Sequence, residues 1–368
     1  MLREALTPAR VVVAALGVVA ATVSSVLVPA AAVGRDVDDY VVRTVPAGAS
    51  GTWVAVRGSR VTCTGVGLAD RERGVPATCD TVYDIGSVTK QFTAAAIVKL
   101  QTMGRLDVHD RLGSWFTRPM PRATAAITLQ QLLTHTSGLP DSLGDDYDPL
   151  SRRQLLRRAV RAPLHHAPGR RYAYSNLGYS LLAVVVERAS GTTYERFLRR
   201  SLFRPAGMRS TGYVRPDWTR SSVAVEYDAR GRSHGTPLEH PWAADGPWWN
   251  LRGNGGMLST ARDMARWHRA LSSHRVLDRR ALRELFRPRV REEPGSPGHY
   301  GYGWVVLDTS FGRVVWHNGG NGWSYAELLR VPSRRAAVFW VTNQVRSRDG
   351  GWDLSRLGLT EGVLGRLL

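Results

Sequence analysis

Strand-like patterns near both ends of the chain, separated by a long helical region, restrict how the chain can fold. Residues 53–57 and 60–68 predict two β-strands around the turn at Gly58 and Ser59. The strand pattern returns late in the chain, at residues 303–307, 314–317, 325–331 and 336–342. Turn-like breaks separate these later runs, as in an antiparallel meander.

Residues 105–254 instead show helical periodicity and loops. The order of strands, then helices, then strands is typical of a sheet domain that carries a helical insertion. We therefore expect an α/β fold in which helices flank an antiparallel sheet. Its α/β part comprises residues 36–104 and 255–368, and residues 105–254 form an all-helical insertion.

The first 34 residues indicate a targeting segment. Arg3 and Arg10 precede an uncharged stretch at 11–34, and the small residues after Pro29 suit a cleavage site. We expect a signal peptide at residues 1–32 and a secreted or cell-envelope protein. The alternative is an uncleaved N-terminal membrane anchor, because the uncharged stretch is long enough to span a bilayer.

The two cysteines, Cys63 and Cys79, lie on either side of the turn-like residues 70–74. An even number of cysteines in an exported chain favours a disulfide. We therefore predict a Cys63–Cys79 bridge.

The net charge of +19 raises the question of an anionic partner. The basic residues are scattered through every segment, without a zinc-finger or RNP signature, so we do not expect nucleic-acid binding. Electrostatic association with an anionic cell envelope fits this pattern, and so does an arginine-rich composition without any particular partner.

The stretch Gly86-Ser87-Val88-Thr89-Lys90 lies between a strand-like run at residues 81–85 and a helical pattern at residues 91–103. A serine and a lysine three residues apart at a helix start lie on one face, where an amine can take a proton from a hydroxyl nucleophile. All but two of the 50 basic residues are arginine, and the two lysines are Lys90 and Lys99. Arginine cannot serve as a base, so a titratable amine beside Ser87 is a catalytic candidate. The structural alternative is a helix cap followed by a solvated lysine.

Two further polar motifs follow in the chain, Tyr174-Ser175-Asn176 and His317-Asn318-Gly319. Taken singly, the first could be a buried tyrosine beside a helix cap, and the second a hairpin turn. With the serine–lysine pair, they place polar groups at a helix start, in a loop and at a strand edge. Neither lysine follows a glycine, which excludes a phosphate-binding Gly-Lys-Ser/Thr motif. The histidines show no metal-binding spacing with cysteine, so we expect neither a metal nor an organic cofactor.

The three motifs together resemble the class C branch of the serine β-lactamases and penicillin-binding proteins, with its esterase and D-peptidase relatives. Residues 134–139 and 255–260 are also similar to that family, and the resemblance covers residues 36–368. It implies that Ser87 is the acylated nucleophile and that Lys90 holds or receives its proton. Tyr174 would be a second proton-transfer residue, with a phenolate stabilised by Lys90.

The resemblance also assigns the substrate-binding groups. Asn176 would bind the amide side chain of the substrate, and the backbone N–H groups of Ser87 and Gly320 would form an oxyanion hole. His317, with Gly319 in the same motif, occupies a position where the well-known β-lactamases of this branch have a lysine. A histidine is mostly neutral at pH 7, so recognition of an antibiotic carboxylate is weakened while acyl transfer remains.

The sequence thus predicts an exported serine hydrolase that acts through an acyl-enzyme. Its substrate would be a small-molecule or peptide amide or ester, plausibly a D-amino-acid peptide derived from the cell wall. One alternative is a true β-lactamase. Another is a penicillin-recognising protein that is acylated but does not turn over, although Tyr174 and Asn176 argue against a pure trap.

Overall fold

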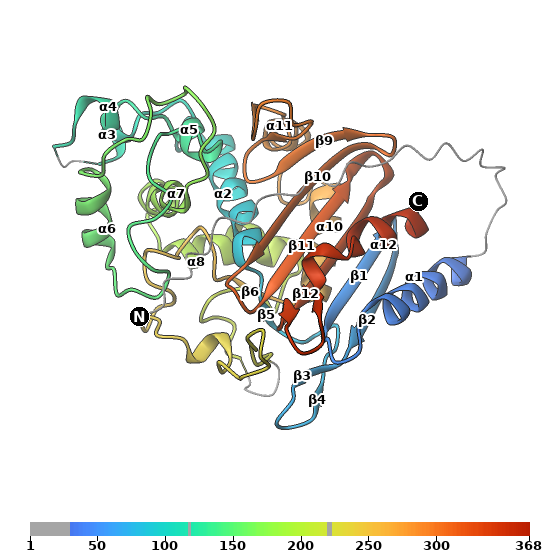
Figure 1. Cartoon of the computed structure of the whole chain (residues 1–368). Helices are drawn as coiled ribbons and strands as arrows, with labels where there is room; N and C mark the ends of the chain where they lie inside the picture. Colours follow the sequence, from blue (N-terminus) through green and yellow to red (C-terminus); the bar gives the residue numbers. More distant parts are fainter. Residues whose placement is uncertain (1–29, 117–118, 219–222) are drawn as a thin grey trace.

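The centre of the fold is an eight-stranded antiparallel sheet made from both ends of the chain (Figure 1). The computed structural model describes residues 30–116, 119–218 and 223–368. The strand order is β2-β1-β12-β11-β10-β9-β8-β7. Their bounds are β1 Gly51–Arg57, β2 Arg60–Val66, β7 Val290–Arg291, β8 His299–Tyr300, β9 Val305–Thr309, β10 Gly312–Gly320, β11 Tyr325–Val331 and β12 Ala336–Thr342. Strand β1 pairs with β12 from Gly51–Thr342 to Arg57–Ala336, which joins the early strands to the late meander.

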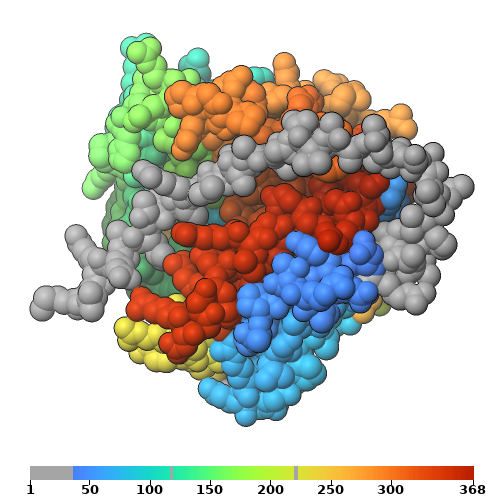
Figure 2. All heavy atoms as spheres, turned by 45° about the vertical axis from the view of Figure 1, so that its right-hand side comes forward, coloured from blue at the N-terminus to red at the C-terminus, as the bar shows by residue number. Residues whose placement is uncertain are grey.

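Side chains of the central strands alternate between two hydrophobic cores, because successive residues of a strand point to opposite faces. Trp53 and Ala55 belong to a smaller core under α1 (Ala30–Thr44) and α12 (Leu359–Leu367). The guanidinium carbon of Arg366 lies 3.9 Å from the centre of the Tyr40 ring, and this cation–π contact joins the two helices. Figure 2 shows the blue α1 region lying against the red C-terminal segment over this face.

The opposite face of the sheet carries the larger core. Val54 and Val56 point into it, together with the buried side of α2 (Lys90–Thr102). Helices α10 (Ala261–Ser272) and α11 (Arg279–Leu285) cover the same face.

Helices dominate the chain between the two halves of the sheet. The bounds are α3 Leu112–Trp115, α4 Arg122–Ala125, α5 Leu129–Leu133, α6 Arg152–Ala159, α7 Asn176–Ser190, α8 Tyr194–Leu198, η2 Arg199–Phe203, α9 Arg204–Ala206 and η4 Pro237–Glu239. Helix α7 is buried over most of its length and ends at Gly191, whose φ of 70° is the left-handed conformation that favours glycine. The antiparallel sheet with flanking helices confirms the predicted fold class.

The remaining strands form short pairings outside the main sheet, and one of them differs from the structure expected from the sequence. The strand expected to end at Ile85 is only β5 (Tyr83–Asp84), and it lies outside the main sheet, where it pairs with β6 (Leu258–Ser259). The 3-10 turn η1 (Gly86–Thr89) follows it and leads directly into α2. The remaining short elements are β3 Leu68–Asp70, β4 Val75–Pro76, β13 Arg346–Ser347, β14 Trp352–Asp353, η5 Pro332–Arg334 and η6 Leu354–Arg356.

Cys63 of β2 and Cys79 form a disulfide. Closing a loop of this length stabilises the folded chain by roughly 3 kcal/mol through the entropy of the unfolded state.

The predicted export segment, residues 1–32, lies almost entirely outside the described residues. Helix α1 begins at Ala30 and ends at Thr44. Among the described residues, no helix combines the length and the apolar character needed to cross a membrane.

Candidate active site

Ser87 lies at the junction between β5 and α2, where the backbone is held on several sides. The Ile85 N–H donates to the Met257 carbonyl at 3.0 Å, and the Gly86 N–H donates to Asp84 Oδ1 at 2.7 Å. Gly86 has a φ of 50°, a conformation that side chains disfavour. The resulting turn leaves Ser87 partly exposed, while its neighbours Gly86 and Val88 are buried.

Lys90 is one helical turn beyond Ser87 and is fully buried. Its Nζ lies 2.9 Å from Ser87 Oγ, 2.7 Å from Asn176 Oδ1 and 2.8 Å from the Asn254 carbonyl oxygen. The last two atoms can only accept hydrogen bonds. A neutral amine has two hydrogens and one lone pair, so these two acceptors take both hydrogens. The lone pair is then directed at the Ser87 hydroxyl, as a general base requires.

The surroundings of Lys90 lower the pKa of its amine, so that a large fraction of the amine is uncharged at physiological pH. Burial lowers the pKa of Lys90 to about 7, and the carboxylates of Asp141 and Asp146 oppose this shift. Desolvation disfavours the charged form of any buried amine. Lys90 can therefore exist as a base near pH 7, unlike an exposed lysine.

Tyr174 belongs to the loop before α7 and contacts both Ser87 and Lys90. Lys90 Nζ is 4.8 Å from the centre of the Tyr174 ring, and the phenol hydroxyl forms a hydrogen bond with Ser87. Burial raises the pKa of Tyr174, and the bond to Ser87 only partly offsets this. The side chain is thus a neutral phenol in the free protein, which differs from the phenolate that the resemblance implies.

Asn176 is the first residue of α7 and is fixed from two sides. Its Oδ1 accepts from Lys90, and its Nδ2 donates to Asp141 Oδ1 at 3.1 Å. The Ser175 side chain caps the helix by accepting from the Gly178 N–H at 3.1 Å. This cap places the Asn176 amide beside the amine.

The C-terminal end of β10 packs directly on the nucleophile turn. A Cβ at Gly319 would lie 2.1 Å from Ser87 N, and a Cβ at Gly86 would lie 2.2 Å from Gly320 N. Only glycine allows two backbones to come this close. The N–H groups of Ser87 and Gly320 are thereby brought to neighbouring positions.

A match to the β-lactamase family model spans residues 37–359. The chain belongs to the β-lactamase family. It is therefore a serine hydrolase, as the sequence predicts.

Two curated relatives represent the family members that the chain is similar to. Penicillin-binding protein 4* of Bacillus subtilis (strain 168) is 27% identical over 317 residues, which cover 81% of this chain and 68% of the relative. The D-alanyl-D-alanine-carboxypeptidase/endopeptidase AmpH of Escherichia coli (strain K12) is 31% identical over 289 residues, covering 72% of this chain and 71% of AmpH.

Solved structures show the same relationship. A penicillin-binding protein from Bacillus halodurans superposes with a TM-score of 0.75 at 26% identity, covering 90% of this chain and 99% of that one. A β-lactamase/D-alanine carboxypeptidase from Pseudomonas syringae gives a TM-score of 0.75 at 18% identity, covering 91% and 99%, and shows the shared fold alone.

His317, the position at which this member of the β-lactamase family departs from the lysine pattern, is buried on β10. Burial, followed by the charge of Lys90, lowers the pKa of His317 to about 3. Its Nδ1 donates to the Asn318 carbonyl at 2.6 Å, and its Nε2 accepts from the Tyr300 hydroxyl at 2.9 Å. His317 is therefore a neutral residue whose two ring nitrogens are already occupied.

His135 is a site residue that sequence reasoning did not single out, although it lies in the 134–139 segment of the family resemblance. Its ring centre lies 4.2 Å from that of Tyr174 and 4.6 Å from that of Tyr300. Its Nδ1 accepts from the Ser175 N–H at 3.0 Å, which links the ring to the cap of α7. Burial lowers the pKa of His135, so it supports Tyr174 as an uncharged ring.

A second group of polar residues that the sequence analysis did not identify lies next to the C-terminal end of β10. Asn321 Nδ2 donates to Asp84 Oδ2 at 3.1 Å and to Glu226 Oε1 at 2.8 Å. His240 Nε2 lies 2.6 Å from Glu226 Oε2. These contacts tie the residue after Gly320 to the strand before Ser87. Asp84 and Glu226 gave no sequence signal, because single acidic residues are common on surfaces.

The chain also contains the spacing Gly-x-Ser-x-Gly at residues 231–235, which marks the nucleophile of another class of serine hydrolase. Ser233 is exposed in a loop and its Oγ accepts from the Gly235 N–H at 3.2 Å. No strand-to-helix turn presents it, so Ser87 remains the nucleophile candidate.

No cluster of three histidine, cysteine or acidic side chains suited to a metal occurs in residues 30–116, 119–218 and 223–368.

Proposed function

We propose that this protein is an exported serine hydrolase that cleaves an amide or ester through an acyl-enzyme on Ser87, with D-amino-acid peptides or esters as its substrate class. The observation that carries the proposal is the buried Lys90 amine, whose two fixed acceptors leave its lone pair for Ser87 Oγ. The names of relatives that act on D-alanyl peptides support the substrate class.

The chemistry follows from these positions. Lys90 takes the Ser87 proton as Oγ attacks the carbonyl carbon, and the N–H groups of Ser87 and Gly320 receive the developing oxyanion. The Tyr174 hydroxyl, bonded to Ser87, is placed to pass a proton to the leaving group. Water then attacks the ester on Ser87, with the same groups returning the proton to Oγ.

The charges around the site favour a substrate without a carboxylate next to the scissile bond. The neighbouring charges that act on Lys90 are the carboxylates of Asp141 and Asp146, and His317 is neutral. An anionic group here would meet carboxylates without a fixed cation. This supports esters and D-amino-acid peptides whose scissile bond lies away from a free carboxylate. It disfavours β-lactams and peptides cut at their C-terminal residue, because both carry a carboxylate next to the scissile bond.

Hydrolysis of p-nitrophenyl acetate tests the assignment of the base. Lys90→Ala and Ser87→Ala are each expected to lower kcat/KM at least about a hundredfold. Lys99→Ala is the matched control, because Lys99 is the other lysine of the chain and its Nζ donates to the Val276 carbonyl, away from Ser87. Undiminished activity in purified Ser87→Ala would refute the nucleophile. Fast steady-state turnover of nitrocefin would instead favour a true β-lactamase, and a stoichiometric burst without turnover a binding protein.

A further inference from the structure

A second, basic pocket lies at the end of the sheet opposite the active site. At the active-site end of β11, Tyr325 pairs with Gly320 of β10. At the other end of β11, Val331 pairs with Ala336 of β12. The strand spans roughly 20 Å at the usual rise per residue. The pocket has a volume of about 310 Å³ and lies beside the β1–β2 turn, the β11–β12 turn and the C-terminal end of α10. It therefore shares no residue with the acyl-transfer site.

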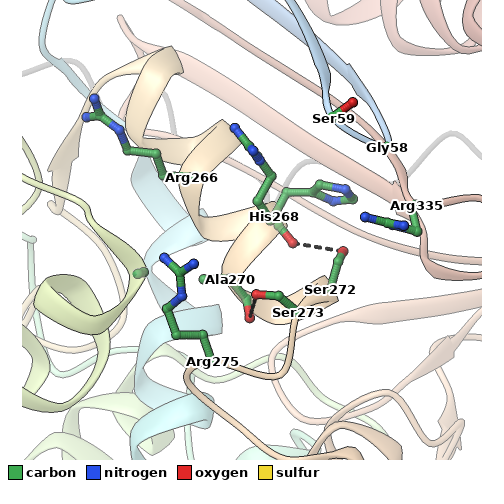
Figure 3. A pocket seen from close by; sticks show the side chains of 11 residues that line it. Gly58, Ser59, Arg266, His268, Ala270, Ser272, Ser273, Arg275 and Arg335 are labelled. Atoms are coloured by element: carbon green, nitrogen blue, oxygen red, sulfur yellow. Dashed lines mark hydrogen bonds between the residues drawn. The ribbon is translucent and has the colours of Figure 1, made fainter.

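Arginines gather around this pocket without acidic neighbours in its lining (Figure 3). Arg269, Arg275 and Arg335 are exposed, and none of their guanidinium groups forms an ion pair or hydrogen bond within the described residues. Arg266 also lines the pocket and bonds to Asp263 at 2.7 Å. Figure 3 shows Arg275 and Arg335 on either side of the C-terminal end of α10.

The floor of the pocket is backed by a buried arginine. Arg330 is 1% exposed, and no carboxylate pairs with it in the described part of the chain. Its Nε donates to His268 Nδ1 at 2.9 Å, and its Nη2 donates to Ser272 Oγ at 3.2 Å. Its Nη1 is buried and has no hydrogen-bond partner there. Both His268 and Ser272 line the pocket, so an uncompensated charge lies directly behind them.

His268 does not supply the missing negative charge. Burial lowers its pKa, and so do the charges of Arg330 and Arg269. Because its Nδ1 accepts from Arg330, its remaining proton lies on Nε2, which donates to the backbone carbonyl of Arg335, so the ring is neutral. Arg335 itself has a φ of 51°, a left-handed conformation that favours glycine.

We propose that this pocket binds an oxyanion of the phosphate class. Four arginines line one small space, and guanidinium forks match phosphate oxygens in paired hydrogen bonds. The buried Arg330 charge behind His268 and Ser272 also attracts a multiply charged anion in the pocket more strongly than a singly charged carboxylate. The Ser59 hydroxyl, which forms no hydrogen bond in the described structure, adds a donor at the β1–β2 turn.

Calorimetric titration with inorganic phosphate, at constant ionic strength set with chloride, tests the pocket. We expect one saturable site in the full chain. The double variant Arg269→Ala/Arg335→Gly is expected to lose at least tenfold in affinity, with glycine chosen because it suits the left-handed backbone. The matched control Arg279→Ala/Arg280→Ala removes the same charge from exposed positions of α11 and is expected to bind as the unmodified chain does. Equal loss in both double variants, or no saturable binding, overturns the proposal.

Two further measurements separate the pocket from the acyl-transfer site and from a fold defect. Ester hydrolysis in the Arg269→Ala/Arg335→Gly variant is expected to be unchanged, so loss of phosphate binding with intact hydrolysis supports a distinct site. Arg330→Met removes the buried charge and keeps much of the side-chain volume, and it is expected to weaken phosphate binding while the melting temperature without phosphate does not fall. Undiminished phosphate affinity in folded Arg330→Met contradicts the role of the buried charge.

Phosphatidylglycerol vesicles distinguish a lipid headgroup from free phosphate. Vesicle binding that disappears in the Arg269→Ala/Arg335→Gly variant assigns a headgroup, whereas phosphate binding without vesicle binding assigns a free phosphate. Vesicle binding that survives in that variant overturns a membrane role for the pocket.

Discussion

At the scale of single residues, the chemistry depends on the protonation of Lys90. The hydrogen-bond partners of Lys90 could be predicted only in part from the sequence. The spacing of Ser87 and Lys90 predicted their contact, because three residues make nearly one helical turn. The Asn254 carbonyl could not be predicted, since a backbone acceptor carries no residue signature and lies far along the chain.

The pH dependence of acylation follows from this environment. Lys90 must lose its proton to act, so the acylation rate is expected to rise with pH and level off above about 7, where the lowered pKa of Lys90 lies. Stopped-flow measurement of the p-nitrophenol burst between pH 5 and 9 gives the midpoint. Asp146→Asn removes a carboxylate that raises the pKa of Lys90, so it should move the midpoint to lower pH.

Asp349→Asn, an exposed change on the loop after β13, should leave that midpoint in place. A midpoint near the usual lysine range in the unmodified chain would rule out Lys90 as the buried base.

At the scale of elements, the site is the meeting of three segments: the β5–η1 turn, the start of α7 and the end of β10. The sequence located each segment through a short motif. It could not predict that β5 pairs with β6 instead of joining the main sheet, because Tyr83 and Asp84 form too short a run to show alternation. The pairing matters, since it sets the direction in which the chain enters the nucleophile turn.

The close approach of β10 to η1 predicts a strong effect of a single methyl group. Gly319→Ala would place its Cβ 2.1 Å from Ser87 N, so one backbone must move and the oxyanion donors separate. We expect kcat to fall by about 10²–10³, as for the loss of one such donor. Gly365→Ala in α12 is the control, because among the described residues a Cβ there meets no atom within 4 Å beyond its own neighbours in the helix.

Ester hydrolysis and melting curves together check this prediction. Gly365→Ala should keep its activity and its melting temperature. A Gly319→Ala variant that is folded and fully active would contradict the assignment of the oxyanion donors.

At the scale of the whole molecule, the two faces of the sheet pack against different hydrophobic cores. The larger core supports the active site, whereas the face under α1 and α12 carries a smaller core. The strand-like runs near both ends of the chain, such as residues 53–57, allowed the sheet to be predicted. The basic pocket was not predicted, because scattered arginines reveal their convergence only after the two turns and α10 come together.

Glu327 on β11, the cross-strand partner of Asn318, offers a test of stability. Burial raises the pKa of Glu327 to about 7, well above the value of an unfolded chain. The folded state therefore keeps this proton longer, and the stability that the neutral carboxyl contributes below the unfolded pKa is lost as pH rises from there to about 7. Glu327→Gln should leave the melting temperature unchanged at pH 4 and raise it at pH 8.

Glu72→Gln, at an exposed position, serves as the control and should change neither value. An equal drop in melting temperature between pH 4 and pH 8 in the unmodified chain and in Glu327→Gln would show that this carboxyl is not responsible.

The most direct test of the acyl-enzyme is to map where the chain becomes covalently modified. Incubation with a fluorophosphonate, followed by intact-protein and peptide mass spectrometry, is expected to show one adduct, on Ser87, that forms far more slowly in Lys90→Ala. An adduct on another serine such as Ser233, or no adduct on the active protein, would contradict the account.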